Sequence, residues 1–148
     1  MLMRKFLIAC IGMLMSVVSV QAQTKADDLL GVYKAVQNDE VSKVEFRKNG
    51  DGYMAQVIWV NKLKDANGNI RLDSKNPDKS KRDTPINKIV LIDKVTFDEA
   101  KGEWNEGRIY DPTRGKFFKV RLSFKDAKTL KVRGSWGPIS ESTYWSKY

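Results

Sequence analysis

The feature that most constrains the fold of this chain is a series of short segments that alternate apolar and polar residues. Within residues 104–148 these segments are separated by tight-turn signals, and the first corner lies at residues 107–115 (GRIYDPTRG). A strand that alternates in this way is buried on one face only, so successive hairpins must curl until their apolar faces meet. The pattern predicts a β-barrel or a β-sandwich.

The same pattern is present in the first half of the chain. In residues 41–48, Val44 and Phe46 share one face and Lys43, Glu45 and Arg47 the other. Residues 49–52 (NGDG) form the strongest hairpin signal, because Asn and Gly tolerate a positive φ. The returning segment, residues 53–60, is apolar on both faces apart from Gln56. We therefore expect both faces of that strand to be covered.

Eight strands are expected in all, after a short helical turn at residues 26–30. Their approximate bounds are 31–36, 41–48, 53–60, 89–97, 103–110, 116–124, 130–136 and 142–147. Eight strands close into a barrel that just holds side chains or one small ligand. The sequence therefore predicts an all-β fold, an antiparallel up-and-down barrel.

Residues 62–88 break this rhythm with Asp, Asn, Gly and Pro amid charged residues. A loop of this length in a compact domain is usually functional, mobile or both. Its segment Asp65 to Asn69 looks like the start of a calcium-binding loop. An EF-hand needs Gly at its sixth position and Glu at its twelfth, and Ile70 and Asn76 stand there instead. A polar turn explains the segment, and we expect no metal site.

The first 22 residues have the three parts of an export signal. Arg4 and Lys5 supply positive charge, an apolar run follows over residues 6–20, and Ala22 ends a small-residue cleavage pattern. The run is shorter than the roughly 20 apolar residues that span a bilayer. We expect cleavage after Ala22 and a periplasmic or secreted protein.

Cys10 follows a segment that looks like a lipoprotein cleavage box. The apolar run continues well beyond Cys10, whereas a lipobox normally closes such a run, so lipidation is not expected. Residues 23–148 remain as one β-barrel domain, which we expect to be a monomer. This size suits a single core that buries about two-thirds of its unfolded surface.

The residues after the expected signal offer little for catalysis. They contain no Cys and the chain has no His, which removes disulfides, the usual transition-metal ligands and the usual acid/base near neutral pH. We expect neither a cofactor nor an enzyme. Carboxylate pairs such as Glu106 with Asp111 leave a glycosidase-like alternative open, since that chemistry needs two carboxyls roughly 5 to 9.5 Å apart.

Loss of Arg4 and Lys5 lowers the formal net charge from +9 to +7. A basic surface favours anionic lipid headgroups, acidic polysaccharide or nucleic acid, and export makes nucleic acid an unexpected partner. The alternative is a basic surface with no dedicated partner, because the lysines are spread along the chain.

One expected strand carries a face that suits ligand binding. By parity Trp104, Glu106, Arg108 and Tyr110 share a side. In a barrel interior the aromatics would hold the apolar part of an amphipathic ligand and Arg108 its acidic head. An internal Glu106 to Arg108 ion pair, or an outer face with chance aromatics, explains the same pattern.

Other candidate residues lie at the same corner and on the remaining strands. Asp111 and Arg114 are expected at the rim of a pocket, although Asp-Pro and Gly115 also suit a purely structural corner. Further ligand contacts are expected from large aromatics, and further core or lumen positions from aliphatic residues. These are Phe46, Trp59, Phe118, Trp136 and Trp145, together with Val57, Leu91, Val120, Leu122, Leu130 and Val132.

A set of short motifs runs in order along nearly the whole chain after the expected signal. The motifs are Leu30-Gly31-Val32-Tyr33, Asn76-Pro77, Arg82 with Pro85, Trp104, Gly107-Arg108-Ile109-Tyr110-Asp111-Pro112, Gly115, Leu130-Lys131-Val132-Arg133-Gly134 and Trp145. They resemble the bacterial domain of unknown function 2147, a family of small exported proteins. Gly31 and Tyr33 also resemble the Gly-x-Trp opening of lipocalins, with Tyr33 in place of Trp. The resemblance implies a calycin-like (lipocalin-like) antiparallel barrel and supplies no catalytic residue.

Two functions remain open for such a barrel. The first is a non-enzymatic, exported β-barrel that binds a small, partly apolar ligand, such as a fatty acid or another lipid fragment, in its lumen. The second is an envelope interaction module, whose basic surface and residues 62–88 contact anionic glycan, lipid headgroups or a protein. The interior volume of the barrel separates them most directly.

Overall fold

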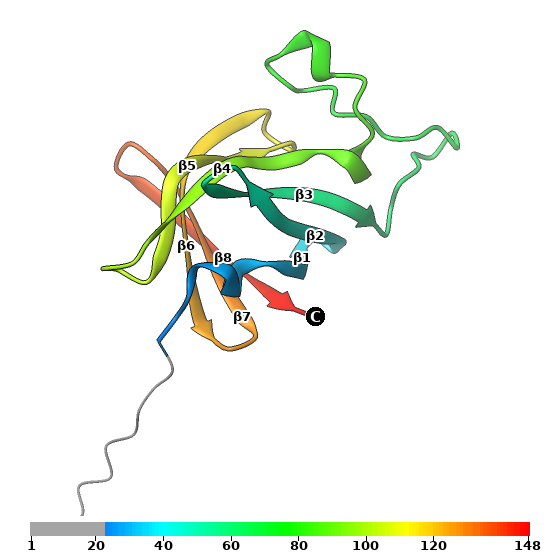
Figure 1. Cartoon of the computed structure of the whole chain (residues 1–148). Helices are drawn as coiled ribbons and strands as arrows, with labels where there is room; N and C mark the ends of the chain where they lie inside the picture. Colours follow the sequence, from blue (N-terminus) through cyan, green and yellow to red (C-terminus); the bar gives the residue numbers. More distant parts are fainter. Residues whose placement is uncertain (1–22) are drawn as a thin grey trace, which may run out of the picture.

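A computed structural model describes residues 23–148 of the chain. Eight antiparallel strands pair in sequence order and close on themselves (Figure 1), which confirms the predicted up-and-down barrel. The expected signal peptide and Cys10 lie outside the described residues. Over residues 23–148, no helix has the length and apolar character needed to cross a bilayer.

The strands begin and end close to the predicted bounds. They are β1 (Gly31–Gln37), β2 (Glu40–Asn49), β3 (Gly52–Val60), β4 (Val90–Asp98), β5 (Glu103–Asp111), β6 (Lys116–Asp126), β7 (Thr129–Trp136) and β8 (Ile139–Lys147). The helical turn is the 3-10 helix η1 (Ala26–Leu29). The largest difference is that β8 starts three residues before the expected position, because Gly137 makes a tight turn at a φ of 57°.

The barrel closes where β1 meets β8. Only two residue pairs join these strands, Tyr33 with Lys147 and Lys34 with Ser146, whereas eight pairs join β7 to β8. The Tyr148 amide extends the seam by donating to the Val32 carbonyl. The seam is therefore short and lies beside the beginning of β1.

One end of the barrel is sealed by η1. Leu29 is fully buried, and three backbone carbonyls of η1 accept side-chain hydrogen bonds from the barrel. The donors are the Tyr33 hydroxyl to Leu29 (2.9 Å), the Trp104 indole to Ala26 (3.1 Å) and the Lys147 ammonium to Asp28 (2.7 Å). This satisfies backbone oxygens that the short helix leaves free. We call this the closed end.

Trp104 lies at the centre of the packing next to the closed end. Its side chain is fully buried, and its ring lies 4.9 Å from that of Phe97 and 5.6 Å from that of Phe124. Phe46 packs in the same core against Tyr33, 5.3 Å away and edge-on. Trp104 and Phe46 were expected to touch a ligand, but they fill the core instead.

A β-bulge reverses the expected direction of Trp59. Val44 pairs with Val57 and Lys43 with Trp59, so Ile58 is an extra residue in β3. A bulge shifts the alternation by one residue, and Trp59 consequently faces outward, where the Lys43 ammonium lies 5.2 Å from its ring. The prediction that Trp59 lines the lumen is wrong, as is the prediction that both faces of β3 are covered, because Ile58 and Trp59 are exposed.

A second bulge, in β5, separates the four residues that parity placed on one face. Trp104 pairs with Leu122 but Gly107 pairs with Val120, so one residue is inserted between them. Glu106 takes up the bulge at a φ of 62° and is exposed. Trp104 therefore points inward while Arg108 points outward and covers the Phe117 ring at 4.1 Å. The prediction that Arg108 lies in the lumen is wrong.

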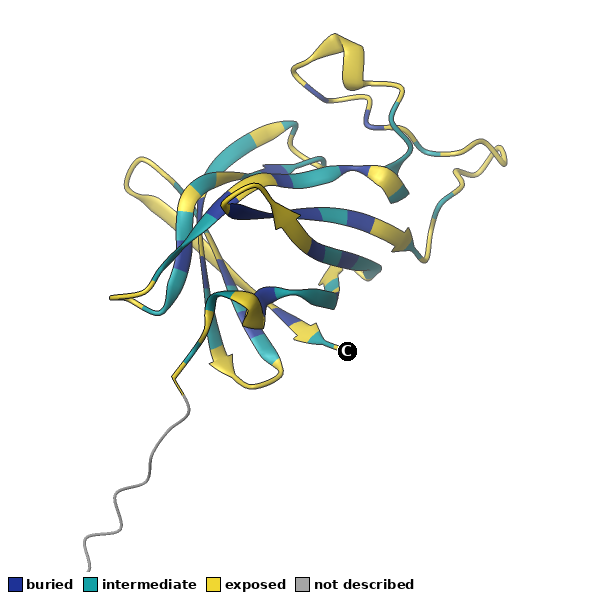
Figure 2. Ribbon diagram, viewed as in Figure 1, coloured by how far each residue is buried: buried dark blue, intermediate teal, exposed yellow. Residues whose placement is uncertain are grey.

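Residues 61–89 form the long loop expected between β3 and β4 (Figure 1). The loop contains two short 3-10 helices, η2 (Lys79–Lys81) and η3 (Ile86–Lys88), and Figure 2 shows it mostly exposed beyond the barrel. Asp65 forms a polar turn by accepting the amides of Asn67 and Asn69. At the end of the barrel opposite η1, this loop and the hairpin tips form the other boundary of the fold, which we call the open end.

Candidate functional site: a cavity at the open end of the barrel

The open end leads into a cavity of about 930 Å³. Inner faces of the strands form its wall, and the long loop and the β5–β6 and β7–β8 hairpins form its mouth. The closed end contributes none of the lining, because aromatic side chains fill that half of the barrel. The barrel is therefore half core and half cavity.

The floor of the cavity is apolar. Ile109 and Phe118 pair across β5 and β6, and Trp145 is buried on β8. Gly134 widens this part of the wall, since an added Cβ would touch the Cβ of Phe118 at 3.4 Å. Aliphatic residues complete the floor: Ala35, Val57, Val60, Ile89, Leu91 and Val132.

Charged side chains of both signs surround the mouth. The Arg71 guanidinium donates to Glu40 and to the Lys62 carbonyl, each at 2.9 Å. Arg114 lies 3.3 Å from Glu141 and 3.6 Å from Asp111. These pairs are partly exposed, so solvent screens them and they contribute little to stability. They are consequently able to exchange partners with a charged group that enters the mouth.

Uncharged polar groups also line the cavity. Gln37 lies at the mouth, at the end of β1, whereas Ser42 and Thr143 lie further along the strands. The pairing of Thr143 with Val132 places it on the inner face of β8. A few polar groups in a largely apolar pocket orient a ligand and set its specificity.

The loop is fastened to the barrel by a buried carboxylate. Asp73 is 3% exposed and accepts two hydrogen bonds, from the Tyr110 hydroxyl at 2.7 Å and from the Asn76 amide at 2.8 Å. The Arg82 guanidinium donates to the Asn76 carbonyl at 2.8 Å. Burial and the bond to Asp73 raise the pKa of Tyr110 above its ordinary value. This loop anchor makes residues 71–76 a fixed part of the cavity wall.

The β5–β6 corner meets the loop at a second point. Gly115 has a φ of 64°, and a Cβ there would clash with the Lys75 carbonyl oxygen. The Lys75 ammonium donates to the Thr113 carbonyl at 2.9 Å. Asp111 accepts the amides of Thr113 and Arg114, so it builds the corner and also lines the cavity.

Six of the ten residues expected to contact a ligand line the cavity, namely Tyr110, Asp111, Arg114, Phe118, Trp136 and Trp145. Phe46 and Trp104 lie in the core, and Trp59 and Arg108 lie on the outside. Among the aliphatic candidates, Val57, Leu91 and Val132 line the cavity, whereas Val120, Leu122 and Leu130 are buried in the core.

Several lining residues were not anticipated. Arg71 and Glu40 come together from a loop and a hairpin tip, which no local pattern signals. Glu141 and Thr143 share the parity of Trp145. Alternation within the predicted strand 142–147 already placed Thr143 on that face, whereas Glu141 required β8 to start at Ile139. Parity predicts that Ile109 faces away from the side of Trp104, but the bulge at Glu106 turns Ile109 toward the cavity.

The side chains that line the cavity offer apolar contacts and charge-assisted hydrogen bonds. Within residues 23–148 no three His, Cys, Asp or Glu side chains gather as metal ligands. The cavity combines an apolar floor with a charged mouth and lies within the roughly 300 to 1,000 Å³ of small-molecule sites. It suits a molecule with an apolar body and a polar end.

A model of the family described as an uncharacterized protein conserved in bacteria, DUF2147, matches residues 31–147. The chain belongs to the DUF2147 family. In this DUF2147 protein the motif residues Asn76, Arg82, Tyr110 and Gly115 meet where the loop is fastened to the barrel. Part of the family motif set therefore falls on the loop anchor and its corner.

The DUF2147 chain is also similar to a solved structure, that of protein HP1028 from the human pathogen Helicobacter pylori, described as belonging to the lipocalin family. The two share 23% sequence identity with a TM-score of 0.64, over 81% of this chain and 82% of the other. This likeness establishes a lipocalin-like fold. A comparison with curated proteins found no match.

Proposed function

We propose that this DUF2147 protein is a non-enzymatic binding protein that holds a small, partly apolar molecule, such as a fatty acid or another lipid fragment, in its barrel. The observation that carries the proposal is the cavity of about 930 Å³ with an apolar floor and a charged mouth. A barrel that served only as a scaffold would have filled this volume with side chains, as it does at the closed end.

The two regions of the cavity indicate how the ligand is oriented. Its apolar part packs against Phe118 and Trp145 on the floor, and its polar end lies at the mouth near Arg71 and Arg114. Glu40 and Glu141 already partner these arginines. A ligand that carries only a carboxylate would compete with these glutamates for the arginines. A ligand head group with both a donor and an anionic acceptor would bond the arginine and the glutamate of one pair.

The test is displacement of a fluorescent fatty acid from the purified protein, combined with native mass spectrometry for co-purified ligand. The variant Thr143→Phe places a ring in the cavity from an exposed inner-face position. We expect it to weaken binding on the order of tenfold or more, because the new ring fills volume that the ligand would otherwise occupy. Ser146→Phe, on the outer face of the same strand, is the matched control and should bind as the parent does.

Equal binding by both variants, or no fatty-acid binding and no co-purified ligand, would reject a lumen site. Circular dichroism on both variants separates loss of the site from loss of the fold.

The proposal also includes export of the chain as a monomer to the periplasm or beyond, with cleavage after Ala22. N-terminal sequencing of the protein from fractionated cells tests the cleavage and the compartment. Gel filtration of that material tests the oligomeric state.

A further inference from the structure

Four large apolar side chains stand exposed around the mouth of the cavity. Their exposed fractions are 64% for Trp136, 58% for Ile139, 49% for Ile70 and 43% for Leu72, and all four border the cavity. Trp136 and Ile139 flank the turn of the β7–β8 hairpin, whereas Ile70 and Leu72 belong to the long loop. Two separate elements therefore present apolar tips at the same end of the molecule.

The fold does not require apolar residues at these positions. Trp136 and Ile139 pair at the very tip of a hairpin, where turn chemistry favours small and polar residues. Ile70 and Leu72 make only isolated bridges, to Lys64 and Pro85. A cluster of exposed apolar side chains bordered by polar ones is typical of an interaction surface.

Positive charge is concentrated beside these tips. Residues 62–88 contain eight basic and four acidic residues, and the structure shows three of the four acids engaged locally. Asp65 accepts backbone amides, Asp73 is buried in the loop anchor, and Asp78 accepts the amide and hydroxyl of Ser80. Three of the four carboxylates are thus engaged in hydrogen bonds within the loop or with the barrel, and Asp83 is exposed.

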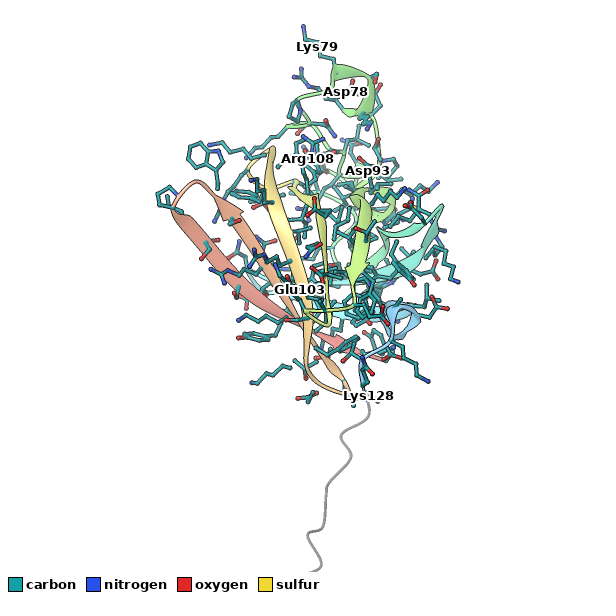
Figure 3. The ribbon with its side chains drawn as sticks, turned by 60° about the vertical axis from the view of Figure 1, so that its left-hand side comes forward. Asp78, Lys79, Asp93, Glu103, Arg108 and Lys128 are labelled. Atoms are coloured by element: carbon teal, nitrogen blue, oxygen red, sulfur yellow. The ribbon has the colours of Figure 1, made fainter. Side chains whose placement is uncertain are left out.

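Three lysines of the loop are exposed, namely Lys64, Lys79 and Lys81, and their ammonium groups lie outside any ion pair of the described residues 23–148. Figure 3 shows Asp78 and Lys79 at the extremity of the molecule opposite Lys128, which lies at the closed end. On the facing hairpin, the Lys116 ammonium lies 5.6 Å from the Trp136 ring. Apolar tips and unpaired cations therefore share the open end.

We propose that the open end docks on an anionic lipid surface, with the mouth of the cavity toward the membrane. Trp136, Ile139, Ile70 and Leu72 would enter the interface, where Trp is favoured because its ring is amphipathic. The lysines of residues 62–88 would meet the lipid phosphates, each contributing a few-fold in affinity. The four apolar side chains surround the mouth of the cavity and do not form one groove. A membrane surface, which is broad and deformable, can contact all of them at once.

This proposal goes beyond ligand binding and does not depend on it. Docking uses side chains at the rim, whereas ligand binding uses the floor. Vesicle binding by Thr143→Phe, whose cavity is blocked, distinguishes the two: retained docking with lost fatty-acid binding supports both proposals. Retained docking without any fatty-acid binding by the parent protein rejects the lumen site alone.

The experiment is flotation of the protein with two kinds of vesicle, one of phosphatidylcholine and one of equal parts phosphatidylcholine and phosphatidylglycerol. We expect strong binding to the anionic vesicles and weak binding to the neutral ones. Binding should fall steeply as salt is added, because exposed charges are screened beyond about 10 Å at 0.1 M ionic strength.

Two pairs of variants locate the surface. Trp136→Ser with Ile139→Ser removes the hairpin tip, and Lys79→Ala with Lys81→Ala removes charge from the loop. Each pair should weaken vesicle binding on the order of tenfold or more. The matched controls are Tyr144→Ser, an exposed aromatic residue on the outer face of β8, and Lys125→Ala with Lys128→Ala on the β6–β7 hairpin. Both controls should bind as the parent does.

Three results would overturn the proposal: no binding to anionic vesicles at low salt, equal binding to both kinds of vesicle, or a loss of binding caused by the controls instead of the open-end variants. Urea unfolding of each variant shows whether its fold is intact. The substituted side chains are exposed, so their stabilities should stay within about 0.5 kcal/mol of the parent.

Discussion

Three buried tyrosines each donate a hydroxyl hydrogen bond that fastens another segment to the barrel. Tyr33 bonds the Leu29 carbonyl, Tyr53 bonds Asp27 at the start of η1, and Tyr110 bonds Asp73 in the long loop. Burial and the neighbouring carboxylate raise the pKa of Tyr53 to about 12. Burial is also the main cause that raises the pKa of Tyr33 and of Tyr110.

These shifts predict a loss of stability in alkali. In the unfolded chain the tyrosines release their protons near the ordinary pKa of 10.0, whereas the folded protein retains them to a higher pH. Their contribution is therefore complete below pH 10 and declines as the pH rises through the folded pKa values. Between pH 10 and its folded pKa, each tyrosine should add a slope of about 1.4 kcal/mol per pH unit.

Urea unfolding at a series of pH values measures this slope. Tyr110→Phe should make it shallower by the contribution of one tyrosine, since the phenol that releases the proton is gone. An unchanged slope in that variant would contradict the assignment of the pKa shift to Tyr110.

At the scale of single elements, two β-bulges explain where prediction from the sequence failed. Strict alternation placed Trp59 and Arg108 inside, and in both strands one inserted residue reversed the direction of the side chains after it. A bulge is set by pairing with the neighbouring strand, so the sequence of one strand carries no periodic sign of it. Gly107 offered the best clue, because a Cβ there would clash with the Lys94 carbonyl of β4.

Strand positions and turns were predictable because the signals that determine them are local in the sequence. The turn at residues 49–52 uses Asn and Gly, whose backbone preferences are local. The packing of β6 and β7 also followed from parity, since their register is regular from Lys119 with Ser135 to Phe124 with Leu130. Contacts between the loop and the barrel, such as Tyr110 with Asp73, join residues far apart in sequence and had no local signature.

The loop anchor predicts that one side chain controls the mobility of the whole connection between β3 and β4. Asp73→Ala leaves the Tyr110 hydroxyl and the Asn76 amide without their buried acceptor, at a cost of about 1.5 to 3 kcal/mol for each bond to a charged group. Hydrogen exchange at the amides of Asp73 and Asn76, which donate to Thr84 and Asp73, should quicken by about tenfold or more.

Asp65→Ala is the matched control for this measurement. It removes a loop carboxylate that bonds only the amides of Asn67 and Asn69, so protection at Asp73 and Asn76 should persist. Equal protection in Asp73→Ala and in the parent would show that the loop is held by other contacts.

At the scale of the whole molecule, the barrel divides into a half that stabilises the fold and a half that forms the cavity. Each half contains a tryptophan that can be substituted to compare them. Trp104 is fully buried beside the closed end, and Trp136 is exposed at the mouth. Trp104→Ala should lower the free energy of unfolding by about 3 to 5 kcal/mol. Trp136→Ala should change it by no more than about 0.5 kcal/mol.

Urea titration followed by circular dichroism measures both free energies. Similar losses in the two variants would mean that packing around the mouth supports the fold as strongly as the core does. Such a result would contradict the division into two halves.

The barrel closure followed from the count of strands and their alternation, whereas the cavity did not. Both depend on inward-facing residues, but a cavity arises only if those side chains fail to meet across the barrel. That outcome depends on the position of each pair along the axis. Trp104 and Phe46 lie beside η1, while Thr143, Ser42 and Gly134 lie toward the mouth. Sequence parity identifies the face of a residue but not its depth.

The short seam between β1 and β8 has a practical consequence. Tyr148 bonds the Val32 carbonyl, and the Lys147 amide bonds the Lys128 carbonyl in the β6–β7 turn, so the last residue lies at the end of the barrel that faces away from the mouth. A peptide tag joined after Tyr148 would serve as a handle on that side. A sensor chip loaded through such a handle would display every molecule with its opening toward the flowing sample.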